Sequence, residues 1–211
     1  MKLDIVYENN DLLIVNKPRG MVTHHGAGVT SGTLQDLLEE YNGAGLDRAG
    51  IVHRLDKNTS GLLVVAKNAA TQERLSQMFR DRRVKRTYIG IVEGIIHTNG
   101  TINKNLIRSP RQRTKYITTK QGGREAITHY EVIEAFKRHT LVRFNLETGR
   151  THQIRVHCKS IGHPLVGDIE YNPKSSIKMH GQMLESVAIA FDDINVEIKP
   201  SQIFVDCLNK L

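Results

Sequence analysis

The spacing of apolar and polar residues predicts short strands along much of the chain. Residues 3–7 and 11–16 have the apolar content and length of strands, and the Asn-Asn-Asp sequence between them is typical of a turn. The run GLLVVAK at 61–67 is apolar enough for a buried strand. Further strands are expected at 86–94, 124–133, 140–147 and near 195–198.

Helices are predicted where apolar residues recur at three- and four-residue steps behind a capping side chain. Thr33 and Asn68 are suitable N-caps for two such helices. Thr151 can cap a short third helix that Gly162 ends, and a last helix is expected from Ser201. The apolar stripes of the first two helices are Leu34, Leu37, Leu38 and Tyr41, and Leu75, Met78 and Phe79.

These elements indicate an α+β fold with a mixed, largely antiparallel sheet and flanking helices, because strands outnumber helices and several strands follow one another directly. The sequence contains no internal repeat and no long linker rich in Pro, Gly or Ser. We therefore expect a single domain over residues 1–211. Two lobes around a central cleft are a variant of the same prediction.

The charge of the chain indicates a polyanionic partner. Lys and Arg number 30 and Asp and Glu 22, which gives a net charge of +8. Segments 74–86 and 104–124 hold 13 of the 30 basic residues, and the second contains no acid. A solvated surface usually mixes both signs of charge. We favour nucleic acid over a membrane surface because no basic amphipathic helix with bulky anchors is present.

Other features of the composition indicate a cytoplasmic protein. The longest uninterrupted apolar run, 62–66, is far shorter than the roughly 20 residues that span a bilayer. The first residues, MKLDIVYENN, do not resemble a secretory signal. Cys158 and Cys207 are far apart and belong to no CxxC sequence, so we expect two inert thiols in a reducing compartment.

The sequence contains incomplete versions of several familiar motifs. GAGVTSG at 26–32 lacks the third glycine of a dinucleotide fingerprint and the lysine of a P-loop, so we expect a flexible loop. HRLDKN and VVAK resemble kinase elements but occur in the wrong order without DFG, and no GxSxG is present. His152 and His157 are five residues apart, which favours ordinary hydrogen bonding over a metal site.

Two segments concentrate residues that can carry chemistry. Asp56 lies in GIVHRLDKNTSG, where donors flank one carboxylate directly before an apolar strand. Alone, such an aspartate is more often a turn or cap residue. The second segment, GRTHQIRVH at 149–157, gathers two arginines, two histidines and a glutamine at a predicted helix start. An arginine there can hold a carboxylate ionised through a bidentate pair.

Three motifs together carry a resemblance to a known family. HRLDKNTSGLLVVAK, ETGRTHQIRVH and VNKPRGMVTHHGAG resemble, in family order, the RluA/RluD-type pseudouridine synthases, which isomerise uridine in ribosomal or transfer RNA. Weaker matches extend the resemblance over about residues 5–171, and the segment after about residue 172 diverges. Many relatives carry an N-terminal RNA-binding domain. Because the catalytic motifs of this chain start near its N-terminus, we expect it to be the catalytic domain without that accessory domain, with a pseudouridine synthase-like fold.

The resemblance implies a role for seven residues. Asp56 would be the catalytic nucleophile, and Arg155 would pair with it and keep it charged. Tyr88 would lie against the uracil and serve proton transfer at carbon 5, although a strand aromatic in the core is the plainer alternative. Arg54 would fill the space left in the RNA stack by the flipped base, and Ile154 would pack beside Tyr88. The residues expected to bind substrate are Arg54, Ile154, His53 and Arg150.

The implied reaction suits these residue types without a cofactor or a metal. Uracil is cut from ribose, turned and rejoined through carbon 5, and a carboxylate can act as nucleophile or base in this process. The uridine must first leave its stack. We expect a monomer that modifies rRNA or tRNA. Two alternatives stay open: a noncatalytic RNA- or ribosome-binding module, and a nucleoside or glycoside hydrolase that would need a second carboxylate near Asp56.

Overall fold

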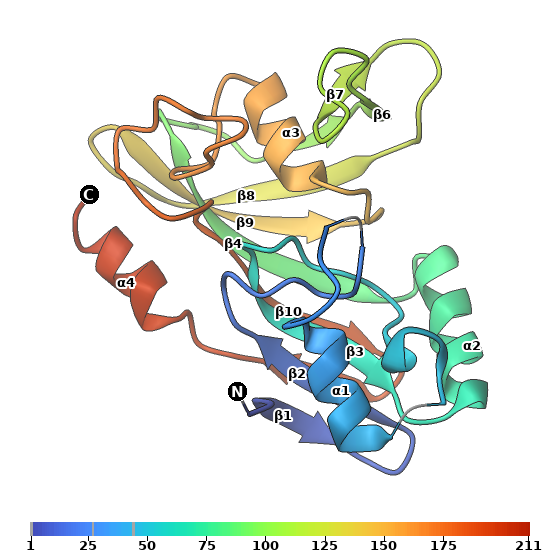
Figure 1. Ribbon diagram of the computed structural model, residues 1–211. Helices are drawn as coiled ribbons and strands as arrows, with labels where there is room; N and C mark the ends of the chain where they lie inside the picture. The colour runs from blue at the N-terminus through green and yellow to red at the C-terminus, as the bar shows by residue number, and fades with distance from the viewer. Residues whose placement is uncertain (1, 27, 44) are drawn as a thin grey trace. The chain divides into compact units, whose positions relative to one another are not determined.

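The computed structural model describes residues 2–26, 28–43 and 45–211 and consists of two compact units. The first unit comprises Met1–Val84 and Ser186–Ile198, and the second comprises Lys85–Glu185 and Lys199–Leu211. Across the described residues, four α-helices flank strands that pair antiparallel, for example β1 with β2 and β4 with β9, which confirms the predicted α+β class (Figure 1). In this part of the chain no helix is long and apolar enough to cross a membrane.

The first unit is built on a sheet with the order β1-β2-β3-β10, in which β11 lies beside β10. The hairpin β1–β2 turns at Asn9, whose side-chain oxygen accepts hydrogen bonds from the backbone N–H groups of Asp11 and Leu12 at 2.9 Å. Its elements are β1 (Ile5–Glu8), β2 (Leu12–Lys17), α1 (Leu34–Asn42), the 3-10 turn η1 (Asp47–Gly50), β3 (Ser60–Ala66), α2 (Ala69–Arg80), β11 (Ile194–Glu197) and most of β10 (Leu184–Phe191).

The core of the first unit lies between β2, β3 and α2. All seven residues of β3 are buried, as the apolar run predicted. Leu75 and Met78 of α2 pack in the same cluster as Leu62 and Val64 of β3. Each such apolar side chain contributes roughly 1.5–3 kcal/mol when fully buried. The strand that follows the Asp56 loop is therefore the most firmly held element near it.

Gly61 shows why β3 can begin where it does. Its φ of +109° lies in a region that residues with a Cβ rarely adopt. A Cβ at this position would lie 2.1 Å from the backbone oxygen of Ser186. Only glycine therefore allows the loop before β3 to enter the sheet this close to β10.

The predicted caps are confirmed at three helices. Thr33 forms a capping box with Asp36 at the start of α1, and Asn68 and Ser201 cap α2 and α4. The stripe predicted for α1 is partly wrong, because Tyr41 is 49% exposed. Its hydroxyl donates to Glu8 at 3.0 Å, so this ring lies at the rim of the helix instead of in the core.

The second unit combines a sheet of the order β4-β9-β8-β5 with a separate hairpin, β6–β7. The β6–β7 hairpin lies beside α3, away from the long strands (Figure 1). The elements are β4 (Lys85–Glu93), β5 (Gly100–Asn103), β6 (Asn105–Arg108), β7 (Tyr116–Thr119), β8 (Ile127–Ala135), β9 (His139–Leu146), α3 (Gln153–Ser160) and α4 (Gln202–Leu208).

The start of α3 differs from the prediction. Thr151 does not cap it; the N-cap is His152, whose φ of 58° is left-handed and whose side chain makes no capping hydrogen bond. The Gln153 side chain holds the preceding turn instead. Its oxygen accepts from the N–H of Arg150 at 2.9 Å and from the Thr148 hydroxyl at 2.7 Å. The turn before α3 is thus fixed by a residue inside the helix.

Candidate active site

The seven residues assigned from the sequence fall in both units. The first unit carries three of them on the loop 53–60, called here the carboxylate loop. The second unit carries four, on β4 and at the start of α3. The members are His53, Arg54 and Asp56 in the first unit and Tyr88, Arg150, Ile154 and Arg155 in the second.

The carboxylate loop is held by its own backbone carbonyls. The oxygen of Leu55 accepts from the Thr23 hydroxyl at 2.7 Å, inside the core. The oxygen of Asp56 accepts from the N–H of Thr59 at 3.0 Å, and the oxygen of Lys57 accepts from the N–H of Gly20 at 2.9 Å. Three consecutive carbonyls around the carboxylate are therefore bonded, which fixes the main chain that carries it.

Lys17, at the end of β2, donates a hydrogen bond to this loop. The side chain is fully buried, and its ammonium donates to the carbonyl oxygens of Pro18 at 3.0 Å, Met21 at 2.8 Å and Lys57 at 3.2 Å. Three acceptors match the three protons of an ammonium. Burial lowers the pKa of Lys17 to about 7, while the charge of Asp56 acts in the opposite direction. Lys17 and Asp56 therefore interact electrostatically within the first unit.

His53 and Arg54 have different surroundings. The Nε2 atom of His53 accepts from the N–H of Val64 at 2.9 Å, and its ring stacks on Phe79 with 4.5 Å between centroids. This imidazole is part of the packing between the loop, β3 and α2, and its substrate role stays a prediction. Arg54 is exposed, and its Nη1 lies 3.4 Å from Nε2 of His24.

In the second unit Arg155 is held by carboxylates. Its Nε donates to Asp168 Oδ2 at 2.8 Å and its Nη2 to Asp168 Oδ1 at 2.9 Å, and Nη2 also contacts Glu170. Arg155 is 5% exposed and Asp168 is fully buried. This bidentate geometry is the strongest that the two groups can adopt. The pairing of Arg155 with Asp56 would join the two units and stays a prediction.

Tyr171 connects α3 to the β6–β7 hairpin. Its hydroxyl accepts from the N–H of Tyr116 on β7 at 2.8 Å and lies 2.9 Å from Nδ1 of His152. The guanidinium of Arg155 lies over the Tyr171 ring, 4.9 Å from its centroid. Burial raises the pKa of Tyr171 to about 12, so this hydroxyl keeps its proton. The hairpin and Arg155 thus share one anchoring residue.

His152 and His157 are both hydrogen-bonded, as expected. His157 is fully buried, with Nδ1 2.9 Å from the Thr128 hydroxyl and Nε2 3.0 Å from the oxygen of Lys104. Burial lowers the pKa of His157, which favours its neutral form. The described residues contain no group of three or more His, Cys, Asp or Glu side chains arranged to hold a metal ion.

Tyr88 and Arg86 are neighbours in the buried part of β4. Tyr88 is 5% exposed and pairs across the sheet with Phe144. Arg86 is 6% exposed, and burial lowers its pKa while the proximity of Tyr88 opposes this effect. A Cβ at Gly149 would lie 2.4 Å from Nη1 of Arg86, so this glycine leaves room for the guanidinium. Arg86 is thus a buried residue near Tyr88 that sequence reasoning counted only as surface charge.

The remaining two residues belong to the start of α3. Ile154 is 4% exposed. Arg150 is half-buried, and its Nε donates to the oxygen of Glu125 at 2.9 Å. Asp168 and Glu170 were not predicted as site residues. Asp168 ends the sequence GHPLVGD at 162–168, and an acid that follows an arginine-rich helix so closely was the available signal.

Three arginines of the basic segment 74–86 lie beside acids at the surface. Arg74 pairs with Asp192 at 2.6 Å and Arg80 with Glu73 at 2.8 Å. Arg83 lies 3.6 Å from the same Asp192. The side chains of Arg74, Arg80 and Arg83 are 49%, 55% and 62% exposed, whereas Arg86 is buried. Binding of a polyanion by this segment stays a prediction.

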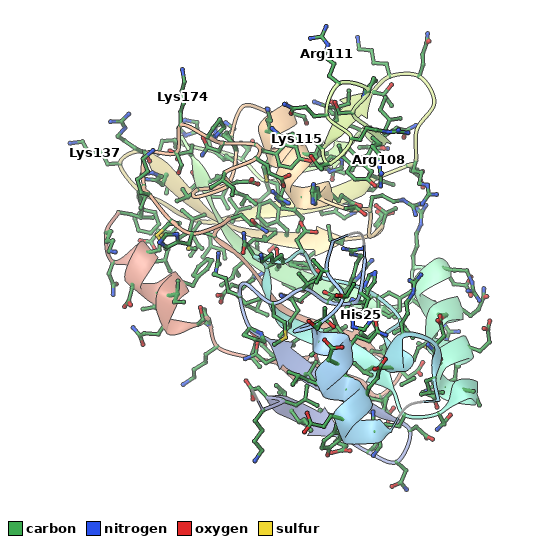
Figure 2. All side chains as sticks on the ribbon, in the orientation of Figure 1. His25, Arg108, Arg111, Lys115, Lys137 and Lys174 are labelled. Carbon is green, nitrogen blue, oxygen red and sulfur yellow. The ribbon has the colours of Figure 1, made fainter. Side chains whose placement is uncertain are left out.

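The segment 104–124 keeps its charge at the surface. It forms the β6–β7 hairpin and its flanks, and no ion pair to it is found among the described residues. Figure 2 shows Arg108 and Lys115 on this hairpin and Arg111 pointing outward from its end. The exposed cations of the segment are Arg108, Arg111, Arg113, Lys120 and Arg124.

Comparison with known proteins places this arrangement in a family. The family model described as RNA pseudouridylate synthase matches residues 11–160. The chain belongs to this family. It is 47% identical over 198 residues to the uncharacterized RNA pseudouridine synthase YlyB of Bacillus subtilis, covering 91% of the chain and 65% of that protein. It is 48% identical to ribosomal large subunit pseudouridine synthase D of Escherichia coli, covering 80% of the chain and 52% of that protein.

Solved structures agree with the family assignment. Human RNA Pseudouridylate Synthase Domain Containing 1 matches with a TM-score of 0.77 and 30% identity, over 98% of this chain and 86% of that one. Human RNA Pseudouridylate Synthase Domain Containing 4 has the same fold, with a TM-score of 0.79 at 21% identity, over 98% and 92% of the two chains. The chain spans about half to two thirds of the length of the curated relatives named above.

Proposed function

We propose that this chain isomerises specific uridines to pseudouridine in structured RNA, and that its substrate is the RNA of a large ribosomal subunit. The observation that carries the proposal is Asp56, a carboxylate on a loop in which three consecutive carbonyls are hydrogen-bonded, in a member of the pseudouridylate synthase family. Relatives named for the ribosomal large subunit favour rRNA over tRNA.

Asp56 is the proposed nucleophile. In the reaction the bond between uracil N1 and ribose C1′ breaks, the base turns, and a bond forms between C5 and C1′. The hydrogen on C5 leaves as a proton and N1 gains one, so the product is an isomer of the substrate. A carboxylate can attack the sugar, attack the base or take a sugar proton. Each step needs a charged carboxylate at a fixed position, which the bonded loop supports.

Tyr88 and Arg155 are proposed to act with Asp56. The phenol of Tyr88 would lie against the uracil and take part in proton transfer at C5. Arg155 would keep Asp56 ionised, and its bond to Asp168 orients the guanidinium for this purpose. The resemblance implies that Arg54 fills the stack that the flipped base leaves, and a phosphate contact is the alternative role for the same guanidinium. Ile154, His53 and Arg150 complete the proposed substrate-binding set.

RNA affinity is proposed to come mainly from the β6–β7 hairpin. Its exposed cations lack acidic partners among the described residues, whereas those of segment 74–86 are largely paired or buried. Phosphate contacts of this kind dominate binding to nucleic acids. We further propose that residues 1–211 work as one catalytic domain, as a monomer without a cofactor, in the cytoplasm, where ribosomal RNA is found.

The decisive experiment is the Asp56→Asn variant. Asn keeps the size and one acceptor oxygen of Asp but is neutral and a poor nucleophile. The variant should fold and bind RNA with affinity equal to or above that of the wild type, and it should release no tritium from RNA labelled at carbon 5 of uracil. Circular dichroism checks the fold, and filter binding measures the affinity.

Two controls make this experiment specific. The double variant Arg111→Gln/Arg113→Gln should weaken binding without removing turnover at saturating RNA, because it changes only the hairpin. Asp47→Asn, on η1 of the first unit, which also carries Asp56, should leave both RNA affinity and tritium release unchanged. Substantial turnover by Asp56→Asn would contradict the assignment of the nucleophile. Binding without turnover by the wild type on every ribosomal RNA tested would favour a noncatalytic RNA-binding module.

A further inference from the structure

His24 is placed beside the carboxylate loop by a contact of its neighbour. Thr23 bonds the carbonyl of Leu55, and this bond sets the adjacent residues His24 and Arg54 side by side, with 3.4 Å between Nε2 and Nη1. Within the described residues the other ring nitrogen, Nδ1, is buried without a hydrogen-bond partner. Because Arg54 can only donate, Nε2 must be the acceptor and the imidazole neutral in this arrangement.

The surroundings of His24 are cationic. Burial lowers the pKa of its imidazole, and the charges of Arg54, Arg48 and His25 lower it further. Asp56 lies two residues from Arg54 on the carboxylate loop, and Asp36 next to His25 is already engaged. Its oxygens accept from Nε2 of His25 at 2.6 Å and from the backbone and hydroxyl of Thr33 (Figure 2 shows His25 beside α1).

We propose that His24 and Arg54 form a binding subsite for one phosphate of the RNA backbone, and that His24 takes up a proton when the phosphate binds. The proposal rests on the proposed function, because its ligand is the substrate RNA. An anionic oxygen placed between Nε2 and Nη1 accepts a hydrogen bond from each. The proton comes from solvent, Nε2 changes from acceptor to donor, and no covalent bond changes.

The subsite gives RNA binding a specific pH dependence. Without the anion, protonated His24 is repelled by Arg54 and Arg48. With the anion bound, the charge on His24 is favourable, so its pKa rises. Linkage then requires affinity to increase as pH falls between the bound and the free pKa, by at most tenfold per pH unit for one proton. Outside that window His24 adds no pH dependence.

The first test measures the His24 ring directly. Wild-type protein with 15N-labelled histidine is titrated with pH by NMR, alone and bound to an rRNA stem-loop that contains uridine. The expected result is a His24 pKa that rises on RNA binding. An unchanged His24 pKa in protein that visibly binds the stem-loop would overturn the proposal.

The second test uses two adjacent histidines as variant and control. For the wild type the stem-loop should bind several-fold more tightly at pH 6 than at pH 8, at constant salt. His24→Gln keeps an acceptor for Arg54 but cannot be protonated, so the increase should shrink. His25→Gln, which can still bond Asp36, should keep it. Equal pH dependence in the wild type and His24→Gln would overturn the subsite.

Turnover separates this proposal from the proposed function. His24→Gln should raise KM and leave kcat almost unchanged, with a larger KM effect at pH 6 than at pH 8. If the wild type modifies RNA but His24→Gln shows no KM effect, only the subsite fails. If the wild type binds the stem-loop with the predicted pH dependence but never releases tritium, the proposed reaction fails and the phosphate subsite stands.

Discussion

The two units hold their proposed functional side chains by different means. In the first unit the Asp56 loop is fixed through main-chain carbonyls, which accept from Lys17, Thr23 and backbone N–H groups. In the second unit Arg155 is fixed through the carboxylates of Asp168 and Glu170. The loop therefore depends on donors that keep their protons at low pH, whereas the arginine depends on acids that must stay ionised.

This difference has a chemical reason. Hydrogen bonds to three backbone carbonyls fix the main chain that carries the Asp56 side chain. A guanidinium carries several N–H donors in a fixed plane, so carboxylates can orient the Arg155 side chain directly at its head group. The two schemes should respond differently to the loss of one partner.

The largest effect is expected for Asp168→Ala in the second unit. This variant removes the bidentate carboxylate from the buried guanidinium of Arg155, and stranding one member of a buried ion pair typically costs ~3–5 kcal/mol. Urea denaturation measures the change in the free energy of unfolding. The matched control is Asp192→Asn, which breaks a partly exposed pair with Arg74 and should cost about 0–1 kcal/mol. Equal costs for the two variants would contradict the structural role of Asp168.

A smaller effect is expected for Lys17→Met in the first unit. The variant removes the donor to three carbonyls, at about 1–3 kcal/mol for an acceptor left unsatisfied, but it also ends the burial of an ammonium group. Hydrogen exchange at the N–H groups of Gly20 and Thr59 should accelerate more than exchange in β3. Lys67→Met, which breaks the ion pair to Glu8, is the control and should leave those amides unchanged. Unaltered exchange in Lys17→Met would show that the loop is held without Lys17.

The smallest effect is expected from acid on Glu93 of the second unit. Burial would raise the pKa of Glu93, but hydrogen bonds from Ser176, Ser175 and Asn172 outweigh it and lower the pKa below 4.5. A carboxyl with a lowered pKa contributes stability that is present above pH 4.5 and is lost as pH falls through its folded value.

The comparison with Glu93→Gln tests this directly. At neutral pH the wild type should be more stable than the variant, and the difference should disappear as the pH falls from 5 towards 3. Lys17 stays protonated over this range, so its hydrogen bonds in the first unit should persist. A difference that is constant over the whole range would mean that the ionisation of Glu93 is irrelevant to its network.

Local pattern predicted much of the fold. β3, α2 and the caps Thr33, Asn68 and Ser201 follow from short-range periodicity and capping chemistry. β10 was missed although VAIAF at 187–191 is an apolar run of strand length, and Glu185 near the start of this strand makes a long-range contact. That carboxylate is 3% exposed and accepts from the N–H of Ser201 at 2.9 Å, a partner 16 residues away. Such a contact cannot be seen in a window of neighbouring residues.

In the candidate site, too, the residues in local motifs were predicted and those that depend on distant contacts were not. Asp56 and Arg155 were found because their motifs concentrate unusual residue types within a few positions. Lys17 and Asp168 were not, because their importance depends on burial and on contacts with loops distant in sequence. The ion pair of Arg74 in segment 74–86 was missed for a related reason, since its partner Asp192 lies more than 100 residues away.

The two buried cysteines allow the opening of the second unit to be followed by thiol labelling. Cys158 in α3 and Cys207 in α4 are both buried thiols, and both belong to the second unit. Burial raises the pKa of the Cys158 thiol far above neutrality, so a thiol reagent can reach a reactive thiolate there only when the helix opens. The rate of labelling in native buffer therefore times the opening of the second unit. The first unit, which has no cysteine in its sequence, contributes no background to that signal.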